Sequence, residues 1–372
     1  MSMFCYQCEQ NAGGKGCQKI GVCGKEPAAA DHMDELVQEC LGISRYARRA
    51  QALGAADRDI DRFVVEALFT TVTNVNFDSA RLADWVKRAQ SMKERARKMY
   101  EEAARQAGKD PETVPPPACA ASVAVKLEKL GSDVGGLQEL IKYGLKGMAA
   151  YADHARVLGV EDAQVYAFFH EALDFLAENP ADVDRLVGMA MKVGEVNLKV
   201  MELLDRGNTG TYGHPEPTQA RITPVKGKCI LVSGHDLKDL ATLLQQTEGK
   251  GVNVYTHGEM LPCLAYPGLK KYKHLVGNYG GAWQDQQKEF DAFPGAVLMT
   301  TNCIQKPRPT YQGRIFTTGL VGWPGVTHVR NGDFSAVIQA ALQAPGFAED
   351  APAKFITIGF ARNAVLGVAG KV

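Results

Sequence analysis

The sequence predicts two kinds of structure in one chain: an all-helical bundle domain, followed by a doubly wound, mostly parallel α/β domain. Between residues 31 and 206, apolar residues recur three and four positions apart, which is the period of amphipathic helices. After residue 227, short apolar runs alternate with helical stretches, an order typical of a Rossmann-like sheet. A chain of 372 residues is also too long for one ordinary hydrophobic core, so more than one domain is expected.

The helical domain begins with a cysteine-rich segment at residues 1–30. Helices are predicted at 31–54, 57–78, 81–108, 133–159, 162–178 and 182–207. Asp31 and Asp57 stand where the N-caps of the first two helices are expected. The bundle therefore spans 31–206, and a stretch rich in Gly, Pro and Thr at 207–227 is predicted to be the interdomain linker.

The α/β domain is expected at residues 228–372. Strands are predicted at 229–234, 252–258, 296–302, 314–318 and 354–360, and helices at 235–249, 281–293 and 334–344. Because a helix separates most of the strands, the connections are crossovers and the sheet is expected to be mostly parallel.

Composition excludes several classes of function. Lys plus Arg and Asp plus Glu both number 42, so no basic surplus exists to hold nucleic acid or anionic lipid. No apolar run reaches about 18 residues, and the N-terminus lacks the layout of a signal peptide, so we expect no membrane partner and a cytoplasmic protein. In a reducing compartment, nine cysteines favour ligands over a disulfide framework.

Three residues of ligand type follow three predicted strands. His235 comes after the first strand, Glu259 after the second and Cys303 after the third. Open α/β sheets bind ligands outside the carboxyl ends of their strands, and these donor types bind iron or zinc. Each residue also has an ordinary interpretation: a helix cap, a solvent-facing carboxylate and a buried thiol. Their shared position favours one joint metal site.

Four cysteines, Cys5, Cys8, Cys17 and Cys23, lie within the first 25 residues in the spacing C-x2-C-x8-C-x5-C. Intervening glycines allow the backbone to wrap closely and to point amides at sulfur. The spacing favours an iron–sulfur cluster. It leaves zinc open, and free thiols in a mobile tail are the ordinary alternative.

The other cysteines and the histidines favour structural roles. Cys40, Cys119, Cys229 and Cys263 are interpreted as structural thiols, and His154 and His170 as packing or surface residues on helices. His257 is a candidate to hydrogen-bond Glu259, and Trp283 is assigned to the core. No GxGxxG motif follows the first strand, so a separate electron donor is expected rather than a bound nicotinamide.

Several sequence blocks carry a family resemblance. MFCYQCEQNAGGKGCQKIGVCGK, ALFTTVTNVNFD, SGHDLKDL, YTHGEMLP, HLVGNYGGAWQDQQKEF, MTTNCI and RIFTTGLVGWPG resemble the hybrid-cluster proteins, that is, the prismane family or hydroxylamine reductases. These blocks are spread over residues 3–330, and GFARNAVLGVAGKV extends the resemblance to the end of the chain. The resemblance implies that the four N-terminal cysteines hold a [4Fe-4S] cubane. It also implies that His235, Glu259 and Cys303 are ligands of a hybrid [4Fe-2O-2S] cluster.

The resemblance also has departures. Family members are longer, with a third α/β domain that supplies further ligands, and no cysteine follows Cys303 here. The last residues, NAVLGVAGKV, read as the opening of a helix, so we expect a missing C-terminal part. Ala361 and Arg362 replace the family's usual Gly and His. This chain would therefore offer only a partial ligand set for the hybrid cluster.

The resemblance implies an iron–sulfur oxidoreductase that reduces hydroxylamine to ammonia, or nitric oxide to nitrous oxide, in nitrosative stress. An electron-donor reductase would be its partner, a small nitrogen oxide its substrate, and Glu259 and His235 its catalytic residues. Two alternatives remain. One is a truncated, inactive electron-transfer module that holds only the cubane, and the other is a zinc-stabilised scaffold.

Overall fold

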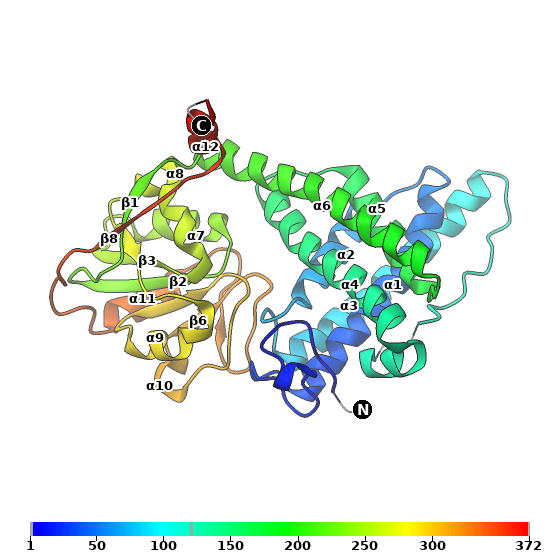
Figure 1. Cartoon of the computed structure of the whole chain (residues 1–372), viewed down its shortest axis with the longest axis horizontal. Helices are drawn as coiled ribbons and strands as arrows, with labels where there is room; N and C mark the ends of the chain where they lie inside the picture. The colour runs from blue at the N-terminus through cyan, green and yellow to red at the C-terminus, as the bar shows by residue number, and fades with distance from the viewer. Residues whose placement is uncertain (1–2, 120–121, 371–372) are drawn as a thin grey trace. The chain divides into compact units, whose positions relative to one another are not determined.

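The structure is a computed structural model that describes residues 3–119 and 122–370. Its contacts divide the chain into two compact units, residues 1–204 and 205–372 (Figure 1). The first is helical and the second contains a parallel sheet, which confirms the predicted fold class. Among the described residues, no helix is both long and apolar enough to cross a bilayer.

The described part of the first unit is a short 3-10 helix followed by a bundle of α-helices. They are η1 (Ala12–Gly14), α1 (Pro27–Gln51), α2 (Arg58–Thr70), α3 (Ser79–Gln106), α4 (Val123–Val157), α5 (Ala163–Ala177) and α6 (Val183–Tyr212), which runs on into the second unit. α1 packs along α3 and α5, and α2 packs on α4. Leu36, Ile43, Val64 and Leu68 are fully buried, as expected for the apolar stripes of amphipathic helices.

Several helix boundaries differ from the sequence prediction, and α2 ends at Thr70, eight residues before the predicted end at residue 78. α1 begins at Pro27 with Glu26 as its N-cap, and Asp31 lies inside the helix, because proline is well suited to the first helical turn. Asp57 does cap α2, accepting a hydrogen bond of 3.0 Å from the Asp59 amide. α4 starts ten residues before the predicted helix at Asp133 and is interrupted at Gly131, whose φ of 77° is not helical.

The second unit is built on a six-stranded parallel sheet. Its strands are β2 (Lys228–Ser233), β3 (Val252–His257), β4 (Leu275–Asn278), β5 (Ala296–Met299), β6 (Ile315–Thr317) and β7 (Thr327–His328). Their order is β4-β3-β2-β5-β6-β7, the doubly wound arrangement in which the chain starts at the centre and fills each side in turn. Ser233 pairs with both His257 and Met299, so the carboxyl ends of β3, β2 and β5 are level.

Helices and short turns connect these strands. They are α7 (Leu237–Thr247), η2 (Gly258–Ala265), α8 (Pro267–Lys270), η3 (Trp283–Asp285), α9 (Gln286–Ala292), α10 (Pro309–Gln312), α11 (Ser335–Gln343) and α12 (Arg362–Ala369). α11 packs on β2 and β5. The central strands are apolar on both faces, and Ile230, Leu231 and Val297 are fully buried, as is typical of a covered parallel sheet.

One predicted strand belongs to a different sheet. Residues 354–360 were expected to extend the main sheet, but β8 (Phe355–Ile358) pairs antiparallel with β1 (Thr218–Arg221) in a separate ribbon. β1 and the end of α6 lie within the segment 207–227 that was predicted to be a linker. Phe355 is 54% exposed, so an apolar run that resembles a buried strand lies at the surface of the described chain.

Candidate metal centres

The N-terminal cysteine loop is closed by a short backbone pairing. Cys5 and Cys17 exchange both amide hydrogen bonds, at N–O distances of 3.0 and 2.8 Å, so their backbones lie directly opposite one another. The amide of Ala12 in η1 points at the Sγ of Cys17 from 3.4 Å. Amide-to-sulfur hydrogen bonds of this kind stabilise thiolate charge.

Asn11 organises the turn between the second and third cysteines. Its amide nitrogen and its side-chain Nδ2 both donate to the carbonyl of Cys8, at 3.3 and 2.7 Å. Its Oδ1 accepts a hydrogen bond of 2.7 Å from the Gly16 amide. Gly16 has a φ of 95°, and a Cβ there would lie 2.8 Å from the ring of Phe4, so the close turn requires glycine.

The fourth cysteine lies on a second tight turn. The Gly21 amide donates to the Lys25 carbonyl at 2.7 Å, and a Cβ on Gly21 would lie 3.0 Å from the Sγ of Cys23. Burial raises the pKa of Cys23, and the charges of Cys5 and Cys8 raise it further, while Lys25 lowers it. Cys23 is therefore within electrostatic reach of two of the other cysteines.

The donor set of this loop fits an iron–sulfur cluster. All four cysteines are free of disulfides, and each is buried or partly buried. In the part of the chain that the structure describes, no three His, Cys, Asp or Glu side chains lie closely enough to hold a single metal ion. Four cysteine thiolates are the usual donor set of a [4Fe-4S] cluster.

At the carboxyl edge of the parallel sheet, His235 is tied to the neighbouring strand end. Gly234 follows β2 directly and has a φ of 113°, and a Cβ there would overlap the Thr300 hydroxyl and lie 2.7 Å from the Thr301 amide. The absence of a Cβ lets the ends of β2 and β5 approach. The His235 amide then donates to Oγ1 of Thr301 at 2.8 Å, and its Nδ1 lies 3.1 Å from the same oxygen.

Cys303 and Glu259 complete the set of three predicted ligands. Cys303 follows β5 and is partly buried, and Gln286 of α9 donates to its carbonyl at 2.6 Å. Burial, together with the charge of Glu259, raises the pKa of Cys303 to about 12, so the two side chains interact electrostatically. Glu259 itself is exposed at the start of η2, directly after β3.

The three residues thus follow three adjacent strands, as the sequence predicted. β2 and β5 are the strands between which the chain reverses its direction of winding, and open α/β sheets bind ligands at that point. His235 and Cys303 follow these two strands, and Glu259 follows the next strand, β3. Their roles as metal ligands, and those of the four N-terminal cysteines, stay predictions.

His257 has different partners from the one predicted. It is fully buried at the end of β3, with Nδ1 3.0 Å from the Ser233 hydroxyl and Nε2 2.8 Å from a carboxylate oxygen of Glu289. Burial lowers the pKa of His257 and Glu289 opposes that shift. Sequence reasoning missed Glu289 because it is 32 residues away, on α9. Trp283 is only partly buried in η3 and lies outside the core to which it was assigned.

The remaining cysteines match their structural interpretation. Cys40, Cys119, Cys229 and Cys263 are all buried. Burial raises the pKa of Cys229 and of Cys263 to about 12, so these thiols stay protonated and inert at neutral pH.

Comparison with known proteins decides the family. A family model described as the Prismane/CO dehydrogenase family matches residues 3–369. The chain belongs to the Prismane/CO dehydrogenase family. Membership supports an iron–sulfur cofactor and agrees with the sequence resemblance.

Among the prismane relatives, hydroxylamine reductases match the whole chain. The protein of that name from Acidithiobacillus ferrooxidans is 53% identical over 389 aligned residues, and that from Syntrophobacter fumaroxidans is 52% identical over 383. The one from the archaeon Methanocella arvoryzae is 50% identical over 381. Each alignment covers 100% of this chain and 70% of the relative, so the chain spans about 70% of their length.

Solved structures of carbon monoxide dehydrogenases are more distant matches. One from a Thermococcus species is 14% identical with a TM-score of 0.42, and the alignment covers 100% of this chain and 60% of that one. Carbon monoxide dehydrogenase IV from Carboxydothermus hydrogenoformans gives 15% identity, a TM-score of 0.43 and the same coverage.

Proposed function

We propose that this chain is an iron–sulfur oxidoreductase of the hydroxylamine reductase type. The observation that carries the proposal is the match of about 50% identity to hydroxylamine reductases over the whole chain. The two candidate metal centres support it independently, because each was located from residue patterns at positions typical of metal sites. None of the comparisons favours the alternative of an inactive module that holds only the cubane.

Two sets of residues would each hold one cluster. Cys5, Cys8, Cys17 and Cys23 would hold a [4Fe-4S] cluster that receives electrons from a separate reductase. His235, Glu259 and Cys303 would hold part of a hybrid cluster at the sheet edge. When bound, such a cluster supplies electrons and an open iron position for a small nitrogen oxide.

The side chains at the sheet edge have distinct tasks. Thr301 fixes the imidazole of His235 through the contact at Nδ1, so the ring keeps one orientation. Cys303 is partly buried with a high pKa, so its thiol would lose its proton only on binding a metal. Glu259 is exposed, and its carboxylate can carry protons between solvent and the site.

The overall chemistry needs both electrons and protons. Hydroxylamine takes up two electrons and two protons and yields ammonia and water through cleavage of its N–O bond. Two nitric oxide molecules take up the same number of each and yield nitrous oxide and water. We propose hydroxylamine as the first substrate to test, because the relatives are named for it.

The test combines iron content with turnover. The protein is purified without oxygen, its iron per chain is measured, and ammonia formation from hydroxylamine is followed with a reduced viologen dye as donor. About eight irons per chain are expected if both clusters assemble, and about four if only the cubane does. Wild-type protein without iron–sulfur absorption would refute the proposal, and four irons without turnover would favour the electron-transfer module.

Glu259→Gln tests the site with a matched control. The variant keeps the size of the side chain but loses the charge and the ability to carry a proton, so turnover is expected to fall at least about tenfold. Glu248→Gln changes another exposed carboxylate, at the end of α7, and is expected to leave turnover unchanged. Equal turnover in both variants would remove Glu259 from the proposed mechanism.

A further inference from the structure

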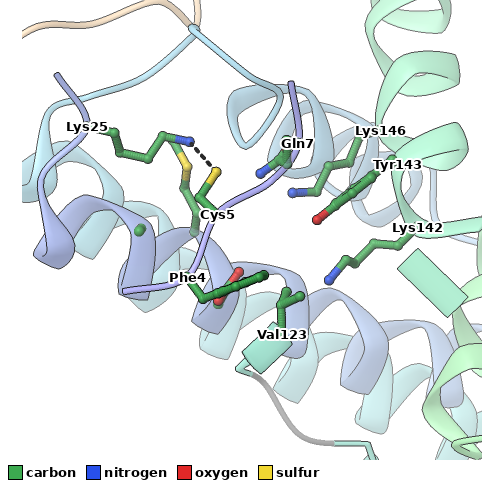
Figure 2. Close-up of a pocket in the computed structure, with 11 residues that line it drawn as sticks. Phe4, Cys5, Gln7, Lys25, Val123, Lys142, Tyr143 and Lys146 are labelled. Carbon is green, nitrogen blue, oxygen red and sulfur yellow. Dashed lines mark hydrogen bonds between the residues drawn. The ribbon is translucent and has the colours of Figure 1, made fainter. Parts of the chain in front are cut away.

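Four lysine side chains are buried in the helical unit close to the cysteine loop. Lys25, Lys126, Lys142 and Lys146 are each 7% exposed or less. Lysine is seldom buried to this degree unless its charge is matched nearby. Figure 2 shows Lys25 approaching Cys5 from one side, while Lys142 and Lys146 of α4 point toward the same space.

Three of these lysines line a small cavity with Cys5. The cavity has a volume of about 10 Å³, enough for a single water molecule, and Asp34 also lines it. The ammonium group of Lys25 lies 4.0 Å from the Sγ of Cys5. Lys146 donates a hydrogen bond of 3.3 Å to the carbonyl of Thr71, which holds its ammonium group in the interior.

The lysines outnumber the carboxylates around them. Glu139 pairs with both Lys126, at 2.8 Å, and Lys142. Asp34 is the other carboxylate that acts on this group, since its charge interacts with Lys25, Lys142 and Lys146. In the described part of the chain, four lysine side chains therefore share the two carboxylates of Glu139 and Asp34, so the lysines outnumber the carboxylates by two.

The excess of buried lysines affects the pKa of Lys146. Burial and repulsion from Lys142 and Lys25 lower the pKa of Lys146 to about 7, despite the opposing charges of Asp34 and Glu139. Unmatched charge in a protein interior is strongly unfavourable, so a further anion is expected beside these lysines. Cys5 is the cavity residue that would become anionic on binding metal.

A cubane held by four thiolates is a net anion, and reduction makes it more negative. We propose that Lys25, Lys142 and Lys146 form a cationic shell that matches the charge of the cluster held by Cys5, Cys8, Cys17 and Cys23, and raises its reduction potential. The inference rests on the proposed function for the presence of that cluster. Its physical basis is that nearby positive charges stabilise the reduced form more than the oxidised form, most strongly where water is excluded.

The test is a reduction potential, measured separately from turnover. Lys146→Met and Lys25→Met remove one charge each and keep an unbranched side chain in the packed interior. The potential is measured by titration with dithionite, with electron paramagnetic resonance as the readout. We expect a more negative potential in both variants and a wild-type value in Lys146→Arg, which keeps the charge.

Lys192→Met is the matched control. Lys192 is 46% exposed on α6 and pairs with Glu171, so its loss is expected to leave the potential unchanged. Potentials equal to wild type in Lys146→Met and Lys25→Met, at full iron content, would overturn the cationic shell. Wild-type protein with no iron–sulfur signal would instead refute the proposed function, so the two failures are distinguishable.

Discussion

At the scale of single residues, the ionisation of Glu161 is expected to make the stability of the folded protein depend on pH. Glu161 belongs to neither candidate centre. Arg62 donates to both of its carboxylate oxygens, at 2.9 and 2.7 Å, and the Tyr166 hydroxyl donates at 2.7 Å. The hydrogen bond from Arg62 is the main reason that the pKa of Glu161 falls to about 2, from an ordinary value of 4.5. The carboxylate form is therefore stabilised in the folded protein.

The sign of the effect follows from linkage. A lowered folded-state pKa contributes stability above pH 4.5, and that contribution is lost as the pH falls from 4.5 toward 2. We expect Glu161→Gln to melt below wild type at pH 6, and the difference in unfolding temperature to shrink steadily on acidification. A difference that stays constant between pH 6 and pH 3 would contradict this account.

The sequence predicted single residues best where one local pattern decides their environment. Cys229, for example, opens an apolar run and is buried as expected. His257 could not be assigned its partner, because Glu289 reaches it through the packing of α9, which no local spacing encodes. The burial of the lysines on α4 was not predicted either, because a charged residue in a helix is ordinarily expected to face solvent.

At the scale of elements, Gly234 controls how closely β2 and β5 approach. Gly234→Ala would place a Cβ against the Thr300 and Thr301 side chains, in addition to the strain of its positive φ. Gly249→Ala is the matched control, because Gly249 has a φ of 72° with open space around it. We expect a loss of about 1 kcal/mol in unfolding free energy at Gly249, and a larger loss at Gly234.

Urea unfolding of both glycine variants measures this difference. Thr301 also holds His235, so displacement of the strand ends in Gly234→Ala should reduce turnover as well as stability. Equal destabilisation at the two positions would mean that the strand ends can separate at no extra cost.

The N-cap of α3 gives a second test at this scale. The carboxylate of Asp78 accepts hydrogen bonds from the amides of Ala80 and Arg81, at 3.0 and 3.1 Å. Asp78→Ala is expected to cost about 1 kcal/mol of unfolding free energy, measured by urea denaturation. Asp84→Ala, on the exposed face of the same helix, should cost well under about 0.5 kcal/mol. Similar costs in the two variants would exclude capping as the cause.

The periodicity of the sequence predicted which segments are helices and which are strands, but it did not predict which strands pair with one another. The segment 354–360 has the composition of a sheet strand, and its partner at 218–221 is more than a hundred residues earlier. β4 and β7 were not predicted, because β4 includes Gly277 and Asn278, which are not typical of strands, and β7 is only two residues long. The sequence did predict a doubly wound, mostly parallel sheet, because helices between strands require crossover connections.

At the scale of the whole molecule, the chain has two compact units, and each contains one candidate centre. The sequence indicated both candidate centres because residues of metal-ligand type lie in recognisable spacings and at strand ends. It did not reveal the buried charge around the first centre, because that charge becomes apparent only when helix α4 packs beside the N-terminal loop. Charge balance at a buried site depends on tertiary contacts.

Because the two candidate centres lie in different units, loss of iron from the N-terminal cysteines is expected to destabilise the first unit and not the second. Cys8→Ala removes one of the four proposed ligands, and the lysines would then lack the anion that matches them, so the first unit should be destabilised. Amide hydrogen exchange is expected to accelerate in the N-terminal loop and in α1 and α4, while β2, β3 and β5 keep their wild-type protection. The comparison uses anaerobic wild-type and variant protein at equal pH. Unchanged exchange in α1 and α4 after loss of iron would show that the buried lysines do not depend on a cluster for their stability.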